Sequence, residues 1–122
     1  MGFEDAVSKA GLTKDKIIDW RQGRLQEGGE DGGFFKGYAF LTKDSFIFVK
    51  DKQFLSGARI MFKIPVKKIK SIKKTLGMVY LSGNTADKDS NILKKIFSTK
   101  SAFMKLDNAD SFITKIKELM AK

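Results

Sequence analysis

The sequence predicts a mainly β domain of the α+β class, in which a bent antiparallel sheet or barrel of about seven short strands is capped by a C-terminal helix. Three observations lead to this prediction. Short runs of aromatic and β-branched residues, separated by turn residues, begin at residue 34. Residues 109–120 carry apolar side chains at helical spacing. The 122-residue chain is 42% hydrophobic and includes eleven Phe, which is enough for the core of one domain.

One or two short helices are expected before the strands. Four apolar residues recur at helical spacing, namely Phe3, Ala6, Val7 and Ala10. Gly11 is a typical residue just beyond a helix end, and a second helix is predicted from Thr13, as its N-cap, to about Leu25. The glycine-rich stretch GGEDGG, residues 28–33, then predicts an exposed loop. We therefore expect residues 1–33 to form a helical extension and residues 34–122 to form the main domain.

Six runs are predicted as strands: residues 34–42, 45–49, 58–64, 78–84, 92–99 and 101–106. The first two are expected to form a hairpin around Lys43-Asp44, and the last two a hairpin joined near Thr99-Lys100. Pro65 lacks a backbone donor, so it should end the third run or place it at a sheet edge. The final helix is predicted from six apolar residues, with Asp107 or Asn108 as its cap: Ala109, Phe112, Ile113, Ile116, Leu119 and Met120.

Three segments resemble the pleckstrin-homology (PH) superfold, and within it the GRAM and bacterial PH-like families. They are GYAFLTKDSFIFVKD (37–51), FKIPVKKIKSIKK (62–74) and KIFSTKSAFMKLDNADSFITKI (95–116). The resemblance covers roughly residues 34–121. It implies a strongly bent, seven-stranded sheet plugged by the helix, and a non-catalytic module that binds membrane phosphoinositides or proteins. The chain departs from the lipid-binding members, because those cluster Lys and Arg around the first loop, which here is only Lys43-Asp44.

The charge of the chain is strongly positive and unevenly spread. Residues 1–31 hold five basic and seven acidic side chains, a net charge of −2, whereas the other 91 residues hold nineteen and seven, a net charge of +12. A folded basic surface attracts anionic partners over a Debye length of about 8–10 Å. Only three of the 24 basic residues are Arg, so diffuse attraction is favoured over bidentate recognition.

The lysines around IPVKKIKSIKK, residues 64–74, are the predicted binding residues. The candidate contacts to anionic ligands are Lys63, Lys67, Lys68, Lys70, Lys73, Lys74, Lys50 and Lys52. Phe54 and Leu55 are candidate membrane contacts at the tip of a long turn. The expected partner is a surface of anionic lipid headgroups or an acidic protein surface. The alternative interpretation is a solvated face that only keeps the protein soluble.

Two other functions remain open. KGYAFLTK, residues 36–43, matches most of the central strand of an RNA-recognition motif, in which Tyr38 and Phe40 would stack on bases. The upstream partner strand and the following helix of that motif are not evident in the sequence. The third hypothesis is a structural protein that forms homo-oligomers through sheet edges or the helices of residues 3–25, with an incidental basic face.

Enzyme chemistry is not expected. The chain contains neither Cys nor His, and its carboxylates show no paired arrangement, so we assign no catalytic residue, metal site or cofactor. Asp87 to Asn91 resembles the start of a calcium loop, but Ile92 stands where that loop requires Gly. The longest apolar run is far below the ~20 residues that span a bilayer. The acidic start MGFEDAVSKAG favours a cytoplasmic protein, or one peripheral at the membrane.

Overall fold

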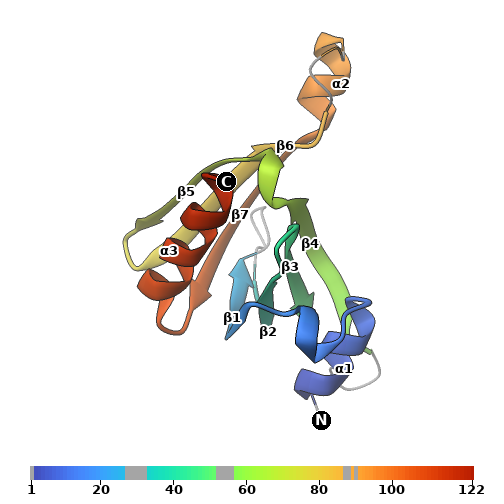
Figure 1. Ribbon diagram of the computed structural model, residues 1–122, viewed down its shortest axis with the longest axis vertical. Helices are drawn as coiled ribbons and strands as arrows, with labels where there is room; N and C mark the ends of the chain where they lie inside the picture. Colours follow the sequence, from blue (N-terminus) through green and yellow to red (C-terminus); the bar gives the residue numbers. More distant parts are fainter. Residues whose placement is uncertain (1, 27–32, 52–56, 87–88, 90) are drawn as a thin grey trace.

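The computed structural model describes residues 2–26, 33–51, 57–86, 89 and 91–122. Within them, seven strands form one antiparallel sheet in the order β4-β3-β2-β1-β7-β6-β5 (Figure 1). The strands are β1 (Asp19–Gln26), β2 (Phe34–Leu41), β3 (Ser45–Lys50), β4 (Arg59–Pro65), β5 (Ile69–Thr75), β6 (Met78–Asn84) and β7 (Thr99–Leu106). The helices are α1 (Gly2–Lys9), α2 (Ile92–Phe97) and α3 (Ala109–Met120), with 3-10 turns η1 (Lys14–Lys16) and η2 (Val66–Lys68). The predicted mainly β class with a C-terminal helix is confirmed.

The sheet is curled but not closed into a barrel. Its edges are β4 and β5, which are joined only by η2. In a flat sheet, six strand spacings would separate these edges by about 29 Å. The four Cα-to-Cα steps from Pro65 to Ile69 span at most about 14 Å, so the sheet must curl until its edges approach each other at η2. The edge position predicted from Pro65 is confirmed.

The predicted helix from Thr13 to Leu25 is wrong, because most of this segment is the central strand β1. β1 is hydrogen-bonded to β2 on one side and to β7 on the other. Gly23 permits the close approach of β7, since a Cβ there would lie 2.3 Å from the Lys105 carbonyl oxygen. Strand pairing on both edges therefore overrides the helical spacing of the apolar residues. Residues before position 33 thus supply the middle of the sheet.

The predicted strand over residues 92–99, and with it the predicted last hairpin, is also wrong. Residues 92–97 form α2, and β7 pairs instead with β6 and β1. The side chain of Asn91 caps α2 by accepting a hydrogen bond from the Lys94 backbone N–H at 2.8 Å. Short apolar runs such as ILKKIF suit a strand or a helix equally, and this cap is the local signal for a helix.

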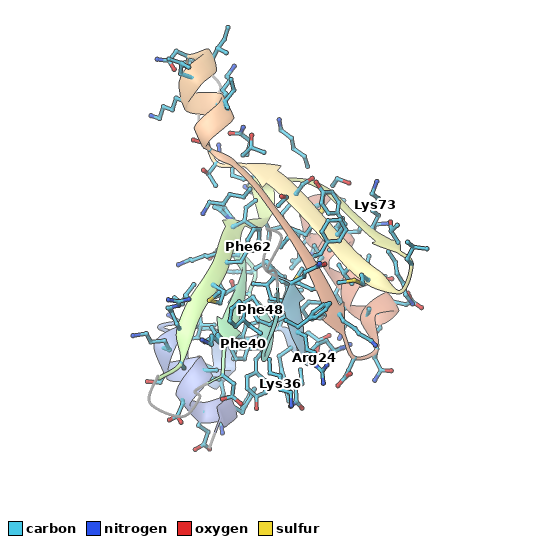
Figure 2. The ribbon with its side chains drawn as sticks, turned by 180° about the vertical axis from the view of Figure 1, so that it is seen from behind. Arg24, Lys36, Phe40, Phe48, Phe62 and Lys73 are labelled. Carbon is cyan, nitrogen blue, oxygen red and sulfur yellow. The ribbon has the colours of Figure 1, made fainter. Side chains whose placement is uncertain are left out.

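Two hydrophobic cores lie on opposite faces of the sheet. The larger core is on the inner face, where α3 buries Ala109, Phe112, Ile113 and Ile116 as predicted. The side chains of Phe48 and Phe62, labelled in Figure 2, belong to this side. Asn108 precedes α3, but its side chain makes no capping hydrogen bond.

The smaller core lies beneath α1, on the outer face of β2 and β3. Ala6, Val7 and Ala10 pack there with Phe40, Ile47 and Val49. The predicted N-terminal helix is thus confirmed, and Gly11 ends it with a positive φ of 73°. In Figure 1, α1 lies at the opposite end of the molecule from α2.

Candidate functional site

Six lysines gather where the two edges of the sheet meet, and we call this group the basic corner: Lys63, Lys67, Lys68, Lys70, Lys95 and Lys100. Lys67, Lys68, Lys70 and Lys95 line a shallow hollow of about 350 Å³. Lys63 and Lys100 lie beside the hollow: Lys100 is paired with Gly83 of β6, and its Nζ donates to the Lys63 carbonyl oxygen at 3.2 Å. Among the described residues, none of the six forms a salt bridge. Five of the six are exposed and Lys68 is half-buried, so an anion at the surface can approach the group.

The backbone around η2 holds the corner in place. Val66 is buried in the inner core, and its N–H donates to the Asp44 carbonyl oxygen at 2.8 Å. Gly83 in β6 makes room for the turn, since a Cβ there would lie 2.3 Å from the Lys68 carbonyl oxygen. Lys68 in turn reaches the Ala86 carbonyl oxygen at 3.5 Å. The corner is thus fixed by the fold, whereas most of its lysine side chains remain exposed.

Helix α2 projects from the body beside the basic corner (Figure 1). Its side chains Ile92, Leu93 and Ile96 are 76%, 66% and 62% exposed. Large aliphatic side chains clustered in this way at the surface mark an interaction site more often than isolated ones do. Lys94 and Lys95 are exposed on the same helix. α2 therefore presents apolar and cationic side chains together.

Hydrogen bonds at the base of α2 attach it to the sheet. Asn84, the last residue of β6, donates from Nδ2 to the Lys95 carbonyl oxygen at 2.5 Å and to Thr99 Oγ1 at 3.1 Å. The Thr85 N–H donates to the Ser98 carbonyl oxygen at 3.1 Å. These contacts are polar and lie at the base of α2, whereas Ile92, Leu93 and Ile96 are exposed to solvent.

The predicted lysines do not all lie together. The structure places Lys63, Lys67, Lys68 and Lys70 in the basic corner, with Lys95 and Lys100 added from distant parts of the chain. Lys73 lies on the outer face with its Nζ 5.7 Å from the ring centre of Tyr80. Lys74 forms an ion pair with Asp110 of α3 at 3.3 Å. The predicted single lysine group is thus divided among several surfaces.

The other predicted contacts lie elsewhere. Lys50, at the end of β3, has its Nζ 4.8 Å from the ring centre of Phe35. Lys52, Phe54 and Leu55 lie outside the described residues. The apolar side chains of α2 were not predicted as contacts, because their segment was expected to be a strand.

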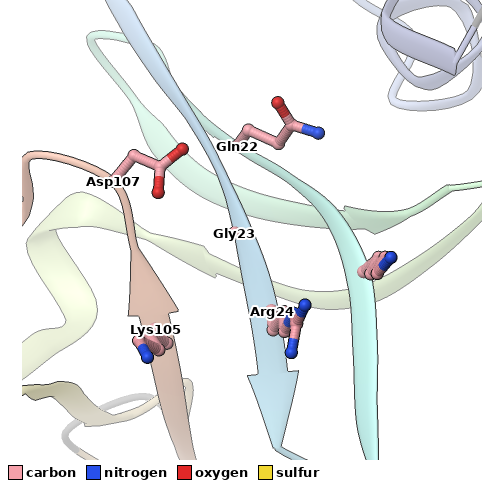
Figure 3. A pocket seen from close by; sticks show the side chains of 6 residues that line it. Gln22, Gly23, Arg24, Lys105 and Asp107 are labelled. Atoms are coloured by element: carbon pink, nitrogen blue, oxygen red, sulfur yellow. The ribbon is translucent and has the colours of Figure 1, made fainter.

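A second basic group crosses the outer face of the sheet, and we call it the cationic row: Lys36, Arg24 and Lys105. Arg24 in β1 is directly opposite Lys36 in β2 and Lys105 in β7. The three line a shallow hollow of about 440 Å³ with Gln22, Gly23 and Asp107, and Figure 3 shows their side chains around it. All three are exposed, and among the described residues none forms a salt bridge.

Three aromatic residues lie beside the cationic row, and we call them the aromatic row: Tyr80, Phe103 and Phe34. Tyr80 and Phe103 are cross-strand neighbours with ring centres 4.7 Å apart. Phe103 and Phe34 are both paired with Gln26, on either side of β1. Phe103 is 43% exposed and Phe34 is 49% exposed. The outer face therefore carries parallel rows of cations and rings.

Tyr38 and Phe40 of β2, the side chains expected to stack on RNA bases, are covered by α1 and its neighbours. Phe40 is fully buried beneath α1, with its ring centre 5.8 Å from that of Phe3. Tyr38 is half-buried beside Phe3 and Trp20. Burial, and to a smaller extent the charge of Asp51, raises the pKa of Tyr38 above its ordinary value. This pair gives no support to base stacking by Tyr38 and Phe40.

The described acidic side chains do not form a metal-binding cluster, and Asp19 is held in ion pairs. Among those residues, no group of three acidic side chains could hold a metal ion. Asp19 is engaged in structure: its carboxylate binds Arg21 at 2.5 Å and Lys115 of α3 at 2.8 Å. Burial raises the pKa of Asp19, but the hydrogen bonds from Lys115, Arg21 and the Trp20 N–H outweigh it and hold the pKa below its ordinary value. No helix of the described chain is long and apolar enough to cross a membrane.

Comparison with known proteins defines the fold alone. No family model matches the sequence, and no curated protein is significantly similar to it. A solved structure, the C-terminal domain of an unknown protein from Leishmania infantum, is similar with a TM-score of 0.62 and 19% sequence identity. The similarity covers 98% of this chain and 95% of that one. The arrangement of strands and helices therefore also occurs in another protein.

Proposed function

We propose that this chain is a non-enzymatic, PH/GRAM-like binding module that docks on anionic membrane surfaces through the basic corner and α2. The two antiparallel meanders joined through β1 and β7, with a C-terminal helix over the inner face, support the PH-like assignment. One observation carries the membrane proposal: three exposed aliphatic side chains lie on a projecting helix beside six lysines.

The two kinds of side chain would act together at a bilayer. Each lysine near an anionic surface contributes about 1 kcal/mol, and this contribution weakens with salt. Full burial of an aliphatic side chain contributes about 1.5–3 kcal/mol, and it does not require anionic lipid. Stable peripheral binding generally needs two such signals. The corner and α2 supply one signal each.

The apolar part of the surface favours a membrane over an acidic protein. An acidic protein surface would pair with the lysines but would leave Ile92, Leu93 and Ile96 in water. A second copy of the chain could cover these aliphatic residues, but it would bring two basic corners together, which electrostatic repulsion opposes. A bilayer containing anionic lipid satisfies both features.

Vesicle flotation tests the proposal with neutral phosphatidylcholine vesicles and vesicles doped with phosphatidylserine. The chain is expected to float with the doped vesicles at low salt and less at physiological salt. Changing Lys67, Lys68 and Lys70 to Gln should reduce binding at least tenfold, because about 3 kcal/mol of attraction is removed. Changing Ile92, Leu93 and Ile96 to Ser should also reduce binding at least tenfold, but should leave its salt dependence intact.

The matched control changes Lys9, Lys16 and Lys117 to Gln. These exposed lysines remove the same charge away from the corner, so binding should fall much less. Equal losses in the control and corner variants would contradict a localised surface. Sedimentation provides a further check, since an α2 variant that changes the molecular mass but not vesicle binding would show self-association instead.

A further inference from the structure

The outer face of the sheet carries the cationic row and the aromatic row, which lie outside the surface proposed for vesicle docking. The cationic row comes from β2, β1 and β7, whereas the basic corner is built around η2 and the base of α2. In Figure 2, Arg24 and Lys36 lie in the lower half of the molecule, far from α2. These residues therefore form a separate surface.

Folding alone gives no reason for the cationic row. Like charges directly opposite one another on neighbouring strands are destabilising. Arg24 faces a lysine on both sides, and no acid among the described residues forms a salt bridge with any of the three. Asp107 also lines the hollow, but it forms no salt bridge with the three cations among the described residues. An anion placed over Arg24 would relieve the repulsion on both sides.

The neighbouring rings indicate what kind of anion fits. Phe34 precedes Lys36 by two residues in β2, and Phe103 precedes Lys105 by two residues in β7. Alternate residues of a strand lie on the same face about 6.7 Å apart. The two rows therefore run side by side across the strands, rings next to cations. Phosphates held at one row would bring attached bases over the other.

We propose that this outer face binds single-stranded nucleic acid. Arg24, Lys36 and Lys105 would contact the phosphates, and Arg24 can bind one with its planar fork. Phe103 and Tyr80 would stack with bases, which is how sequence-tolerant single-strand binders use exposed rings beside a basic groove. Lys73, close to the Tyr80 ring, extends the positive surface toward β5. The surface differs from the covered pair Tyr38 and Phe40.

Fluorescence anisotropy with a labelled oligouridine of about 10 nucleotides tests the proposal. Phe103→Leu keeps an apolar side chain but removes the ring, and should weaken binding at least about fivefold. Trp20→Leu is its control, since Trp20 is similarly exposed but lies near α1, and it should bind like the unchanged protein. Thermal melting confirms that each variant is folded.

Salt dependence tests the phosphate contacts. Changing Arg24 and Lys105 together to Gln should lower the slope of log affinity against log salt by about 1.4, since each contact to a single strand contributes about 0.7. Lys9→Gln with Lys117→Gln removes equal charge and should change the slope by much less. The proposal is overturned if the unchanged protein does not bind at low salt, if Phe103→Leu binds normally, or if both double variants change the slope equally.

Vesicle binding separates this proposal from the membrane proposal. Phe103→Leu should float with phosphatidylserine vesicles as the unchanged protein does. A parallel loss of vesicle and oligouridine binding in this variant would mean that the outer face is a general lipid-contacting surface, which would overturn the nucleic-acid assignment. Failure of flotation alone would leave the oligouridine result standing.

Discussion

Helices α1 and α2 are both short, and both carry aliphatic side chains, but those of α1 are buried against the sheet and those named on α2 are exposed. α1 lies on β2 and β3 and buries Ala6 and Val7 in the smaller core. α2 projects from the ends of β6 and β7 and leaves Ile92, Leu93 and Ile96 in solvent. Burial within the chain therefore explains the apolar side of α1 but not that of α2.

The difference separates residues that maintain the fold from residues that are free to meet a partner. Isolated helices of eight residues or fewer are marginal in water, so packing must stabilise α1, whereas local hydrogen bonds support α2. Substitutions beneath α1 should therefore lower stability, and substitutions on α2 should alter binding. Stability and binding measurements on variants of the two helices test this difference.

Phe40, beneath α1, is the position where a substitution should destabilise the fold most. Phe40→Ala removes a fully buried ring and should lower the free energy of unfolding by about 3–5 kcal/mol. Ile96→Ala on α2 is the matched control, and should change it by less than about 0.5 kcal/mol because its side chain is already exposed. Urea unfolding measures both. Similar losses in the two variants would show that α2 is as integral to the fold as α1.

Local sequence patterns predicted the parts of the fold that have one clear hydrophobic face. Residues 109–120 and Phe3 to Ala10 show helical spacing, and the structure contains both helices. The less exposed positions of β1 are Asp19, Arg21, Gly23 and Leu25, of which only Leu25 is apolar and buried. β1 was missed because its sequence lacks hydrophobic alternation, and because its stability comes from pairing with β2 and with the distant β7. Such non-local pairing leaves no signature in a local window.

Local sequence patterns likewise predicted only part of the candidate site. Four lysines of the basic corner are close in sequence and were predicted from their density. Lys95 and Lys100 join them only because β7 and the base of α2 return to η2. The cationic row could not be predicted, because Arg24 was placed on a helix and its two neighbours come from β2 and β7. Correct assignment of β1 would have been required first.

An intermediate loss of stability is expected at Asp19, which connects β1 to α3, the other well-packed helix. Asp19→Asn removes its ion pairs with Arg21 and Lys115 and should lower the free energy of unfolding by about 1 kcal/mol. The folded state lowers the pKa of this carboxyl, so the contribution is present above its ordinary pKa of about 4 and is lost as the pH falls through the folded value.

Unfolding of the unchanged protein and of Asp19→Asn between pH 7 and pH 3 measures this contribution. The two curves should be separated by a constant amount at pH 6–7 and should converge as the solution becomes more acidic. Lys117→Gln, on α3 but without a salt bridge among the described residues, is the control and should show little separation at any pH. A separation that grows toward acid pH would contradict the ion-pair explanation.

The smallest effect on global stability is expected at Asn91, the cap of α2. Asn91→Ala removes the hydrogen bond to the Lys94 N–H and should weaken the helix locally by about 0.5–2 kcal/mol. Amide hydrogen exchange should then become about 2- to 30-fold faster within α2, while exchange in α1 and the melting temperature stay nearly unchanged. A matching loss of protection throughout the sheet would mean that α2 unfolds together with the body. Its aliphatic side chains would then have to be assigned to the fold rather than to a partner.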